Sequence, residues 1–257
     1  MKPSLTIIGN GFIGQKFLQK HHSNFSTIIT TSQQSPPDIF SSKHIYLDIY
    51  KDPPPLPNTD FCIITIPFSR RLNDPSAYFT GLKKSLKKIK NYKNIFFTSS
   101  TSVYPISNKH LTENDLIANN NRALYLNQCE DWLINQAESA IILRCSGICG
   151  YERNSFEKIK SGLIYDANLP VNLIHVDDII QFIMTLIKSP KSSDIINLSC
   201  TDNPTKEAYY SYLCHKFNLK LPQFKTSKNA YKTISNQKLT RDYVYKMIYP
   251  SPLKFEF

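Results

Sequence analysis

Three of the seven glycines of this chain lie within six positions near its beginning, at Gly9, Gly11 and Gly14. A short apolar stretch at residues 5–8 precedes them, and apolar residues at helical spacing follow. Glycines in a strand-to-helix turn permit a tight bend and let the backbone approach a phosphate, which the first amides of the helix can bind. An ordinary turn is the alternative. We predict a dinucleotide pyrophosphate site formed by Gly9, Asn10, Gly11, Phe12, Ile13 and Gly14.

Hydroxyl side chains stand at the end of the second predicted strand, residues 25–30, where the adenosine ribose of a dinucleotide would lie. These residues are Thr30, Thr31 and Ser32, and no carboxylate follows them directly. A carboxylate at this place holds the ribose hydroxyls of NAD and disfavours a 2′-phosphate. The sequence therefore favours NADP over NAD. Asp48, near the end of the third predicted strand, either reaches the adenine or is a turn residue.

A serine-rich segment at residues 97–105, Phe-Thr-Ser-Ser-Thr-Ser-Val-Tyr-Pro, resembles the short-chain dehydrogenase/reductase superfamily. It is most similar to the extended and atypical branches, which include NAD(P)-dependent and nucleoside-diphosphate-sugar epimerase/dehydratase-like proteins. Further similar segments follow in the order of the family, at residues 144–153, 172–178, 196–204, 235–239 and 249–251. The resemblance thus covers nearly the whole chain.

This resemblance implies roles for several residues outside the glycine turn. Ser100 matches the serine that binds the reacting oxygen, although a turn hydroxyl is the alternative. Arg153 and Glu113 match residues near the substrate pocket of the family. Two further residues are expected beside the cofactor, namely Ser99 and Pro67. Arg70 and Arg71 are either contacts of cofactor or substrate phosphates or solvated loop residues.

The catalytic pair of the family is degenerate in this sequence. In the family a tyrosine exchanges the hydroxyl proton, and a lysine four residues later lowers its pKa, so that general acid–base catalysis accompanies hydride transfer. One register of the segment at residues 121–130 puts Arg122 and Leu126 in these two places. A shift of three residues offers Tyr125, but then Cys129 stands for the lysine. We take Tyr125 as the candidate acid–base residue.

Apolar segments alternate with helical ones through the first 145 residues, with strands expected at 5–8, 25–30, 43–50, 61–66, 94–98 and 140–145. This alternation predicts an α/β fold, a Rossmann-type doubly wound parallel sheet with a small C-terminal substrate-binding appendage. We expect one domain, in which residues 1–145 mainly bind the cofactor and residues 146–257 form most of the substrate pocket.

The net charge of the chain is +11, from 31 basic and 20 acidic residues. One predicted amphipathic segment combines apolar residues at helical spacing with a group of lysines. This pattern favours a solvated helix face over a nucleic-acid site. The lysines are Lys83, Lys84, Lys87, Lys88, Lys90 and Lys93. Six dispersed cysteines, no metal-ligand spacing and no long apolar run predict a cytoplasmic protein with no metal and no membrane contact. Asp177 is expected to cap a following helix.

Two hypotheses follow. The first is an NAD(P)-dependent oxidoreductase or epimerase/dehydratase-like enzyme that acts on a nucleotide-sugar-like or other anionic small molecule. Because family members often pair, the resemblance also admits a homodimer. The second is a non-catalytic NAD(P)-binding redox sensor or scaffold that has lost the Tyr–Lys pair. Fold alone cannot decide between them.

Overall fold

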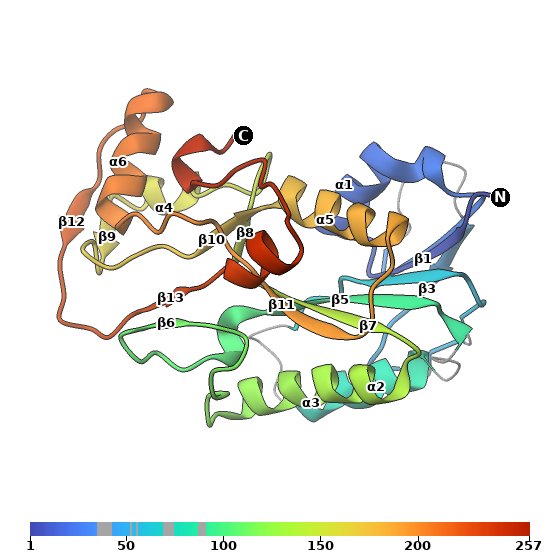
Figure 1. Ribbon diagram of the computed structural model, residues 1–257. Helices are drawn as coiled ribbons and strands as arrows, with labels where there is room; N and C mark the ends of the chain where they lie inside the picture. Colours follow the sequence, from blue (N-terminus) through green and yellow to red (C-terminus); the bar gives the residue numbers. More distant parts are fainter. Residues whose placement is uncertain (35–42, 52, 55, 69–74, 87–90) are drawn as a thin grey trace. The chain divides into compact units, whose positions relative to one another are not determined.

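The computed structural model describes residues 1–34, 43–51, 53–54, 56–68, 75–86 and 91–257 (Figure 1). The chain divides into two compact units. Unit 1 consists of Met1–Val103, Ile117–Arg144 and Ile180–Ile195, and unit 2 of Tyr104–Leu116, Cys145–Ile179 and Ile196–Phe257. The expectation of a single domain stays a prediction.

A seven-stranded sheet has the order β11-β7-β5-β4-β1-β2-β3. Its pairs from β5 to β3 are parallel. This is the strand order of a Rossmann-type sheet, in which the chain starts in the middle and winds outward in both directions. The strands are β1 Ser4–Ile8, β2 Thr27–Ser32, β3 Lys43–Tyr46, β4 Phe61–Ile64, β5 Asn94–Ser100, β7 Ala140–Cys145 and β11 Asp194–Leu198.

Helices cover both faces of this sheet, which confirms the doubly wound α/β prediction. Helix α1 (Phe12–His21) lies on one face, and α2 (Pro75–Ser85) and α3 (Asn121–Gln136) lie on the other (Figure 1). The strands between them are buried on both sides and are almost wholly apolar, as parallel sheets require.

Several element boundaries differ from those expected. Strand β3 ends at Tyr46, well before the expected residue 50. Helix α3 begins at Asn121 because the Asn120 side chain accepts a hydrogen bond from the Ala123 amide at 3.0 Å and caps the helix there. Helix α5 is Val176–Lys188, so Asp177 lies inside its first turn and the capping prediction is wrong.

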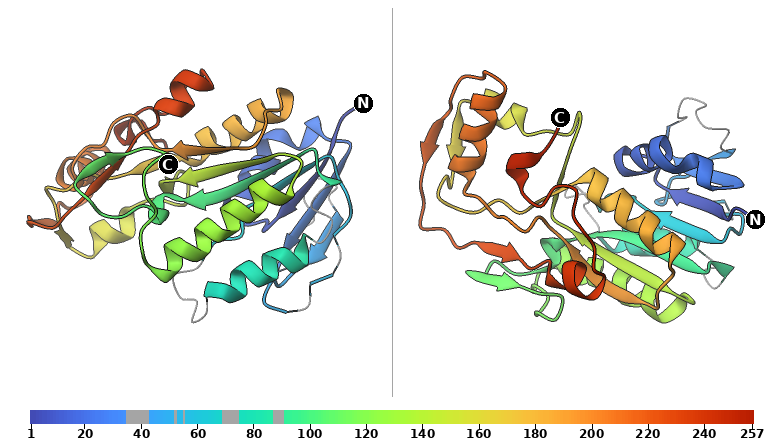
Figure 2. Two further views of the ribbon diagram at one scale, coloured as in Figure 1. Left: turned by 60° about the horizontal axis from the view of Figure 1, so that its bottom comes forward. Right: turned by 45° about the horizontal axis from the view of Figure 1, so that its top comes forward.

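Unit 2 is built on short parallel pairs instead of a broad sheet (Figure 2). The pairs join β6 (Lys109–Leu111) to β13 (Lys232–Ile234), β8 (Gly147–Cys149) to β10 (Leu173–His175), and β9 (Leu163–Tyr165) to β12 (Gln223–Lys225). Helices α4 (Phe156–Lys160) and α6 (Lys206–Lys216) accompany them. The sequence tail contains β13, a π-helical turn at Lys238–Asp242 and a 3-10 turn at Pro252–Lys254, where no periodicity was evident.

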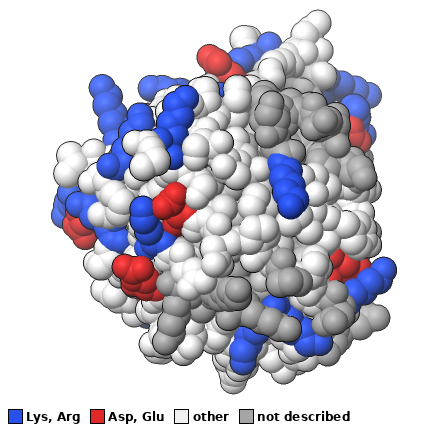
Figure 3. All heavy atoms as spheres, turned by 90° about the vertical axis from the view of Figure 1, so that its right-hand side faces the viewer, with Lys and Arg blue, Asp and Glu red and all other residues white. Residues whose placement is uncertain are grey.

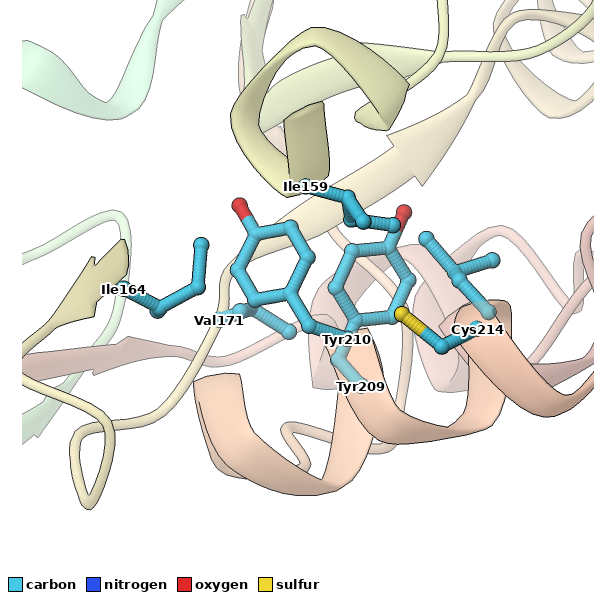
Figure 4. Packing of buried hydrophobic residues seen from close by; sticks show 7 residues of the cluster. Ile159, Ile164, Val171, Tyr209, Tyr210 and Cys214 are labelled. Carbon is cyan, nitrogen blue, oxygen red and sulfur yellow. The ribbon is translucent and has the colours of Figure 1, made fainter. Parts of the chain in front are cut away.

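The core of unit 2 contains two tyrosines. Figure 4 shows the rings of Tyr209 and Tyr210, both from α6, near Ile159 of α4 and beside Val171. The ring centroids of the two tyrosines are 5.2 Å apart in an edge-to-face arrangement, which the ring quadrupoles favour. Burial raises the pKa of both hydroxyls, so they stay neutral in this core.

Basic side chains on the face seen in Figure 3 are scattered, with acidic side chains among them. In α2, Lys83 and Lys84 are exposed while Leu82 is buried, as an amphipathic helix requires; Lys87, Lys88 and Lys90 lie outside the described residues. All six cysteines are buried free thiols. None of the helices in the described part of the chain is long and apolar enough to span a membrane.

Candidate functional site

The glycine turn connects β1 to α1, as predicted, and the neighbouring strand holds it in place. The amides of Gly9 and Asn10 both donate to the carbonyl oxygen of Thr31, at 3.1 and 2.6 Å. Gly9 has a φ of +92°, and a Cβ atom there would lie 2.8 Å from the Ile66 amide nitrogen. Only glycine therefore fits this position, for both conformational and steric reasons.

The other two glycines of the turn have different surroundings. A Cβ atom on Gly14 would lie 3.0 Å from the Ile7 side chain, so this glycine lets α1 pack closely on β1. A Cβ atom on Gly11 would meet only the Gly9 carbonyl oxygen, at 4.0 Å. Gly11 thus leaves open space at the N-terminus of α1, next to the point where the helix begins.

The N-terminus of α1 fits an anionic group. No side chain caps it, so the first amides of the helix and the positive end of its dipole are directed at the space beside Gly11. The Asn10 side chain is buried, and its Oδ1 atom has no hydrogen-bond partner among the described residues. Backbone amides, a helix dipole and glycine-lined space together match the requirements of a pyrophosphate. The contribution of Phe12 and Ile13 would come from their amides.

The hydroxyl groups at the end of β2 are partly used within the protein. Thr31 Oγ1 accepts a hydrogen bond from the Gly9 amide at 3.1 Å, so this residue supports the glycine turn. Thr30 is fully buried, and its hydroxyl lies 3.0 Å from Nδ1 of His44 on β3. Ser32 Oγ lies 3.4 Å from Nε2 of the same ring. The sequence analysis missed His44, which only the pairing of β2 with β3 brings here.

Asp48 and Pro67 have simple surroundings. Asp48 accepts a hydrogen bond from the Tyr50 amide at 3.0 Å and lies 3.7 Å from the Lys51 ammonium, the arrangement of a turn residue. Pro67 is exposed just beyond β4, and its neighbour Phe68 is buried. Arg70 and Arg71 lie outside the described residues.

Ser99 belongs to a buried polar network. Its hydroxyl donates to the carboxylate of Glu130 on α3, and the Arg144 guanidinium from β7 donates to the same carboxylate at 2.7 Å. The Glu130 and Arg144 side chains are 0% and 3% exposed. This network joins three elements of unit 1 and gives Ser99 a structural contact that the sequence did not indicate.

Ser100 and Arg122 approach the same short turn after β5. The Ser100 hydroxyl accepts a hydrogen bond from the Ser102 amide at 3.1 Å, as a turn hydroxyl does. The Arg122 Nε donates to the Ser102 hydroxyl at 3.4 Å, and the guanidinium lies over the Phe68 ring, 4.9 Å from its centroid. The structure therefore brings Ser100 and Arg122 to one turn and adds Phe68, a cation–π partner that the sequence analysis missed.

The two residues of α3 that the sequence analysis matched to the family lysine both lie in the core. Leu126 is 1% exposed and Cys129 is fully buried. Burial, reinforced by the charge of Glu130, raises the pKa of the Cys129 thiol to about 12, so this residue is a neutral thiol near pH 7. Tyr125 lies on the same helix, half-buried. Neither register supplies a cation four residues after a tyrosine.

The two candidate substrate residues lie in unit 2. The Glu113 carboxylate accepts a hydrogen bond from the Asn197 amide at 2.7 Å, and the Asn197 side chain accepts one from the Tyr104 hydroxyl at 2.8 Å. Arg153 is exposed, and its backbone forms a reciprocal hydrogen-bonded bridge with Gly150. Tyr104 and Asn197 are buried residues of this network that the sequence did not single out as a site.

Comparisons with known proteins agree with the fold. Protein YeeZ of Escherichia coli (strain K12) is 28% identical over 206 residues, which are 77% of this chain and 74% of YeeZ. The ADP-L-glycero-D-manno-heptose-6-epimerase of Helicobacter pylori has a TM-score of 0.75 at 14% identity, over 98% of this chain and 94% of the epimerase. The enzyme WbmG of Bordetella bronchiseptica, solved with NAD, has a TM-score of 0.78 at 10% identity, over 98% and 92%. No family model matches the chain.

At these identities the solved structures establish a shared fold. The Rossmann-type fold that the resemblance implies is therefore confirmed.

Proposed function

We propose that this chain binds a nicotinamide dinucleotide through the turn from β1 to α1. The observation that carries this proposal is the open, uncapped N-terminus of α1 beside Gly11, held by the two amides that bond to Thr31. WbmG, which shares the fold, is solved with NAD. When bound, the nicotinamide ring supplies a hydride donor or acceptor.

NADP is the preferred cofactor in this proposal. No carboxylate stands among residues 30–34, and Ser32 and His44 lie together beside the end of β2. An imidazole can donate to a 2′-phosphate, and so can the Ser32 hydroxyl if it turns away from the Gln34 carbonyl oxygen, to which it donates in this structure. Burial lowers the pKa of His44 and so disfavours the charged ring. A phosphate bound beside the ring would act in the opposite direction, because a negative charge stabilises the imidazolium form.

Thermal unfolding with NADPH and with NADH tests this assignment. A ligand that binds the folded state raises the apparent Tm by mass action, and we expect a larger rise with NADPH. Equal shifts would contradict the preference for NADP. For a micromolar Kd, a nucleotide concentration about 1,000 times higher should stabilise the folded state by roughly 4 kcal/mol. If neither nucleotide shifts the Tm under these conditions, the proposal of a cofactor site is wrong.

The reaction proposed for this site is an oxidoreductase or epimerase/dehydratase-like conversion of a nucleotide-sugar-like or other anionic small molecule. The Ser100 hydroxyl, on the turn that also binds Arg122, would orient the reacting oxygen. Tyr125 would exchange its proton, with Arg122 one helical turn away as the nearest cation in sequence on α3.

Tyr125→Phe and Ser100→Ala test these roles in any assay that shows NADPH turnover. Each change should lower kcat by about 100-fold or more, the usual scale of general acid–base catalysis, while the NADPH-dependent rise in Tm stays. Leu124→Ala is the matched control, since Leu124 is an exposed neighbour on the same helix. Full turnover in both variants would exclude these two residues from the reaction.

A specific observation favours the second hypothesis, a non-catalytic dinucleotide-binding sensor or scaffold. Leu126 and Cys129 occupy the lysine place in the core, so the usual means of lowering a tyrosine pKa is missing. A sensor would bind NADP(H), change its stability on binding and show no turnover with any small-molecule carbonyl or alcohol offered.

A further inference from the structure

A short ladder of basic side chains lies in unit 2, where β6 and β13 run side by side (Figure 1). The register of this parallel pair places Lys232 opposite Lys109, and Thr233 opposite His110. The ring of His110 is 2.9 Å from the Thr233 hydroxyl. Paired residues of adjacent strands lie on one face of the sheet, and like charges opposite each other repel, so the two lysines raise the local positive potential together.

Lys232 differs from its neighbours in burial. Lys109 and His110 are exposed, whereas Lys232 is half-buried and its ammonium donates a 2.7 Å hydrogen bond to the carbonyl oxygen of Tyr104. Burial lowers the pKa of Lys232 to about 8 because the charged form has lost part of its hydration. Near neutral pH, an anion bound beside this ammonium would therefore stabilise its charged form more than it would stabilise that of an exposed lysine.

The acidic groups near this ladder are already engaged. Asp115 accepts hydrogen bonds from the Thr112 amide and hydroxyl, at 2.7 and 2.8 Å, and these contacts lower its pKa more than Lys109 and His110 do. Glu113, in the same loop, binds the Asn197 amide. The backbone thus fixes both carboxylates within or beside the loop that follows β6.

We propose that Lys232, supported by the charge of Lys109, binds an acidic group of the substrate, either a phosphate or a carboxylate. This inference rests on the proposed function in taking the ligand to be an anionic small molecule. It differs from the expectation for Arg153, which is an exposed residue, whereas Lys232 is half-buried. The half-buried ammonium on β13 is the better anchor.

Chemical labelling of individual lysines tests the assignment in the wild-type protein. Trinitrobenzenesulfonate modifies free amines, and peptide mapping reports the rate at each lysine. The protein is first saturated with NADPH, so that an added anion does not occupy the glycine turn. Lys228, exposed in the same segment, is the matched control.

We expect inorganic pyrophosphate at about 10 mM to slow labelling of Lys232 roughly fivefold and that of Lys228 less than about twofold, as mass action predicts for a millimolar site. Succinate at the same concentration distinguishes the ligand chemistry. Protection by pyrophosphate assigns a phosphate, and protection by succinate assigns a carboxylate. If neither anion slows labelling of Lys232, or if Lys228 is protected equally, the proposal is overturned.

Calorimetry on variants provides a second measurement. Lys232→Met should weaken binding of the protecting anion about tenfold or more, whereas Lys232→Arg, which keeps the charge, should stay within about threefold. Lys228→Met should bind as the wild type does. If NADPH gives no thermal shift but Lys232 is still protected, the cofactor proposal fails and the anion site stands.

Discussion

The two units of this protein reach a buried core in different ways. In unit 1, parallel strands made of aliphatic and small residues form one broad sheet, and its interior contains a buried ion pair of Glu130 and Arg144 to which Ser99 is hydrogen-bonded. In unit 2, three-residue strands form separate pairs, and tyrosines and buried carboxylates fill the interior. We infer that unit 1 depends on a few irreplaceable contacts, whereas unit 2 spreads its stability over many polar ones.

The largest expected effect comes from Arg144→Met, which leaves the buried Glu130 carboxylate without its guanidinium. We expect a loss of about 3–5 kcal/mol in the free energy of unfolding, the usual result of breaking a buried pair. The matched change in unit 2 is Lys206→Met, because Lys206 and Asp166 form a pair whose side chains are 31% and 28% exposed. That change should cost far less, because water screens a partly exposed pair.

Urea denaturation followed by circular dichroism measures both variants. The double variant Glu130→Met with Arg144→Met should recover much of the loss, since an apolar pair of similar volume often replaces a buried ion pair. Similar losses for Arg144→Met and Lys206→Met would contradict the contrast between the units.

Two glycines of positive φ provide the next comparison. Gly9→Ala places a methyl group 2.8 Å from the Ile66 amide and should cost about 3 kcal/mol, from strain and overpacking combined. Gly162 in unit 2 has a φ of +75°, and a Cβ atom there meets nothing within 4 Å. Gly162→Ala should therefore cost only about 1 kcal/mol, the conformational part alone.

The same urea titrations measure these losses, and the NADPH thermal shift gives a second readout. Gly9→Ala should abolish that shift, because the turn must move to accommodate the methyl group. Gly162→Ala should leave it unchanged. A Gly9→Ala protein with wild-type stability would show that the turn tolerates a side chain after all.

The last comparison concerns pH and begins with Asp60 of unit 1. A hydrogen bond from Lys93, supported by two from Ser4, lowers the pKa of Asp60 to about 2. A carboxyl whose pKa is lowered by folding stabilises the protein above its unfolded pKa near 4, and this contribution disappears as pH falls toward 2. Because Asp60 is partly exposed, we expect only about 1 kcal/mol.

Asp178 of unit 2 should show the opposite sign. Burial raises its pKa, although the amides of Ile248 and Tyr249 donate to it. Its contribution is therefore greatest below the unfolded pKa and falls as pH rises through the folded pKa. The difference in the free energy of unfolding between wild type and Asp60→Asn should grow from pH 2 to 4. The corresponding difference between wild type and Asp178→Asn should shrink as pH rises. Slopes of equal sign would contradict this distinction.

The sequence predicted unit 1 better than unit 2 for a physical reason. Strands buried on both faces, such as β4 and β7, consist of continuous apolar runs between turn residues, and the glycine turn marks the start of α1. The three-residue strands of unit 2 are too short to show a period, and long-range contacts alone pair β6 with β13.

The candidate site could be predicted only in part, for a related reason. The glycines and Ser100 lie in local motifs that can be read from the chain. The contact of His44 with Thr30 depends on the register of β2 with β3, and the Lys232 hydrogen bond to Tyr104 joins residues 128 positions apart. No local pattern contains that information.

The packing of α3 also limits what this protein can become. Leu126 and Cys129, the two residues that the sequence analysis matched to the family lysine, are buried in the hydrophobic core. A lysine introduced there would bring an ammonium into an apolar interior, at a cost of several kcal/mol, before it could assist any tyrosine. A single substitution to lysine at either position would therefore destabilise the fold. Any acid–base role that α3 has must come from side chains that the core leaves accessible, such as Tyr125.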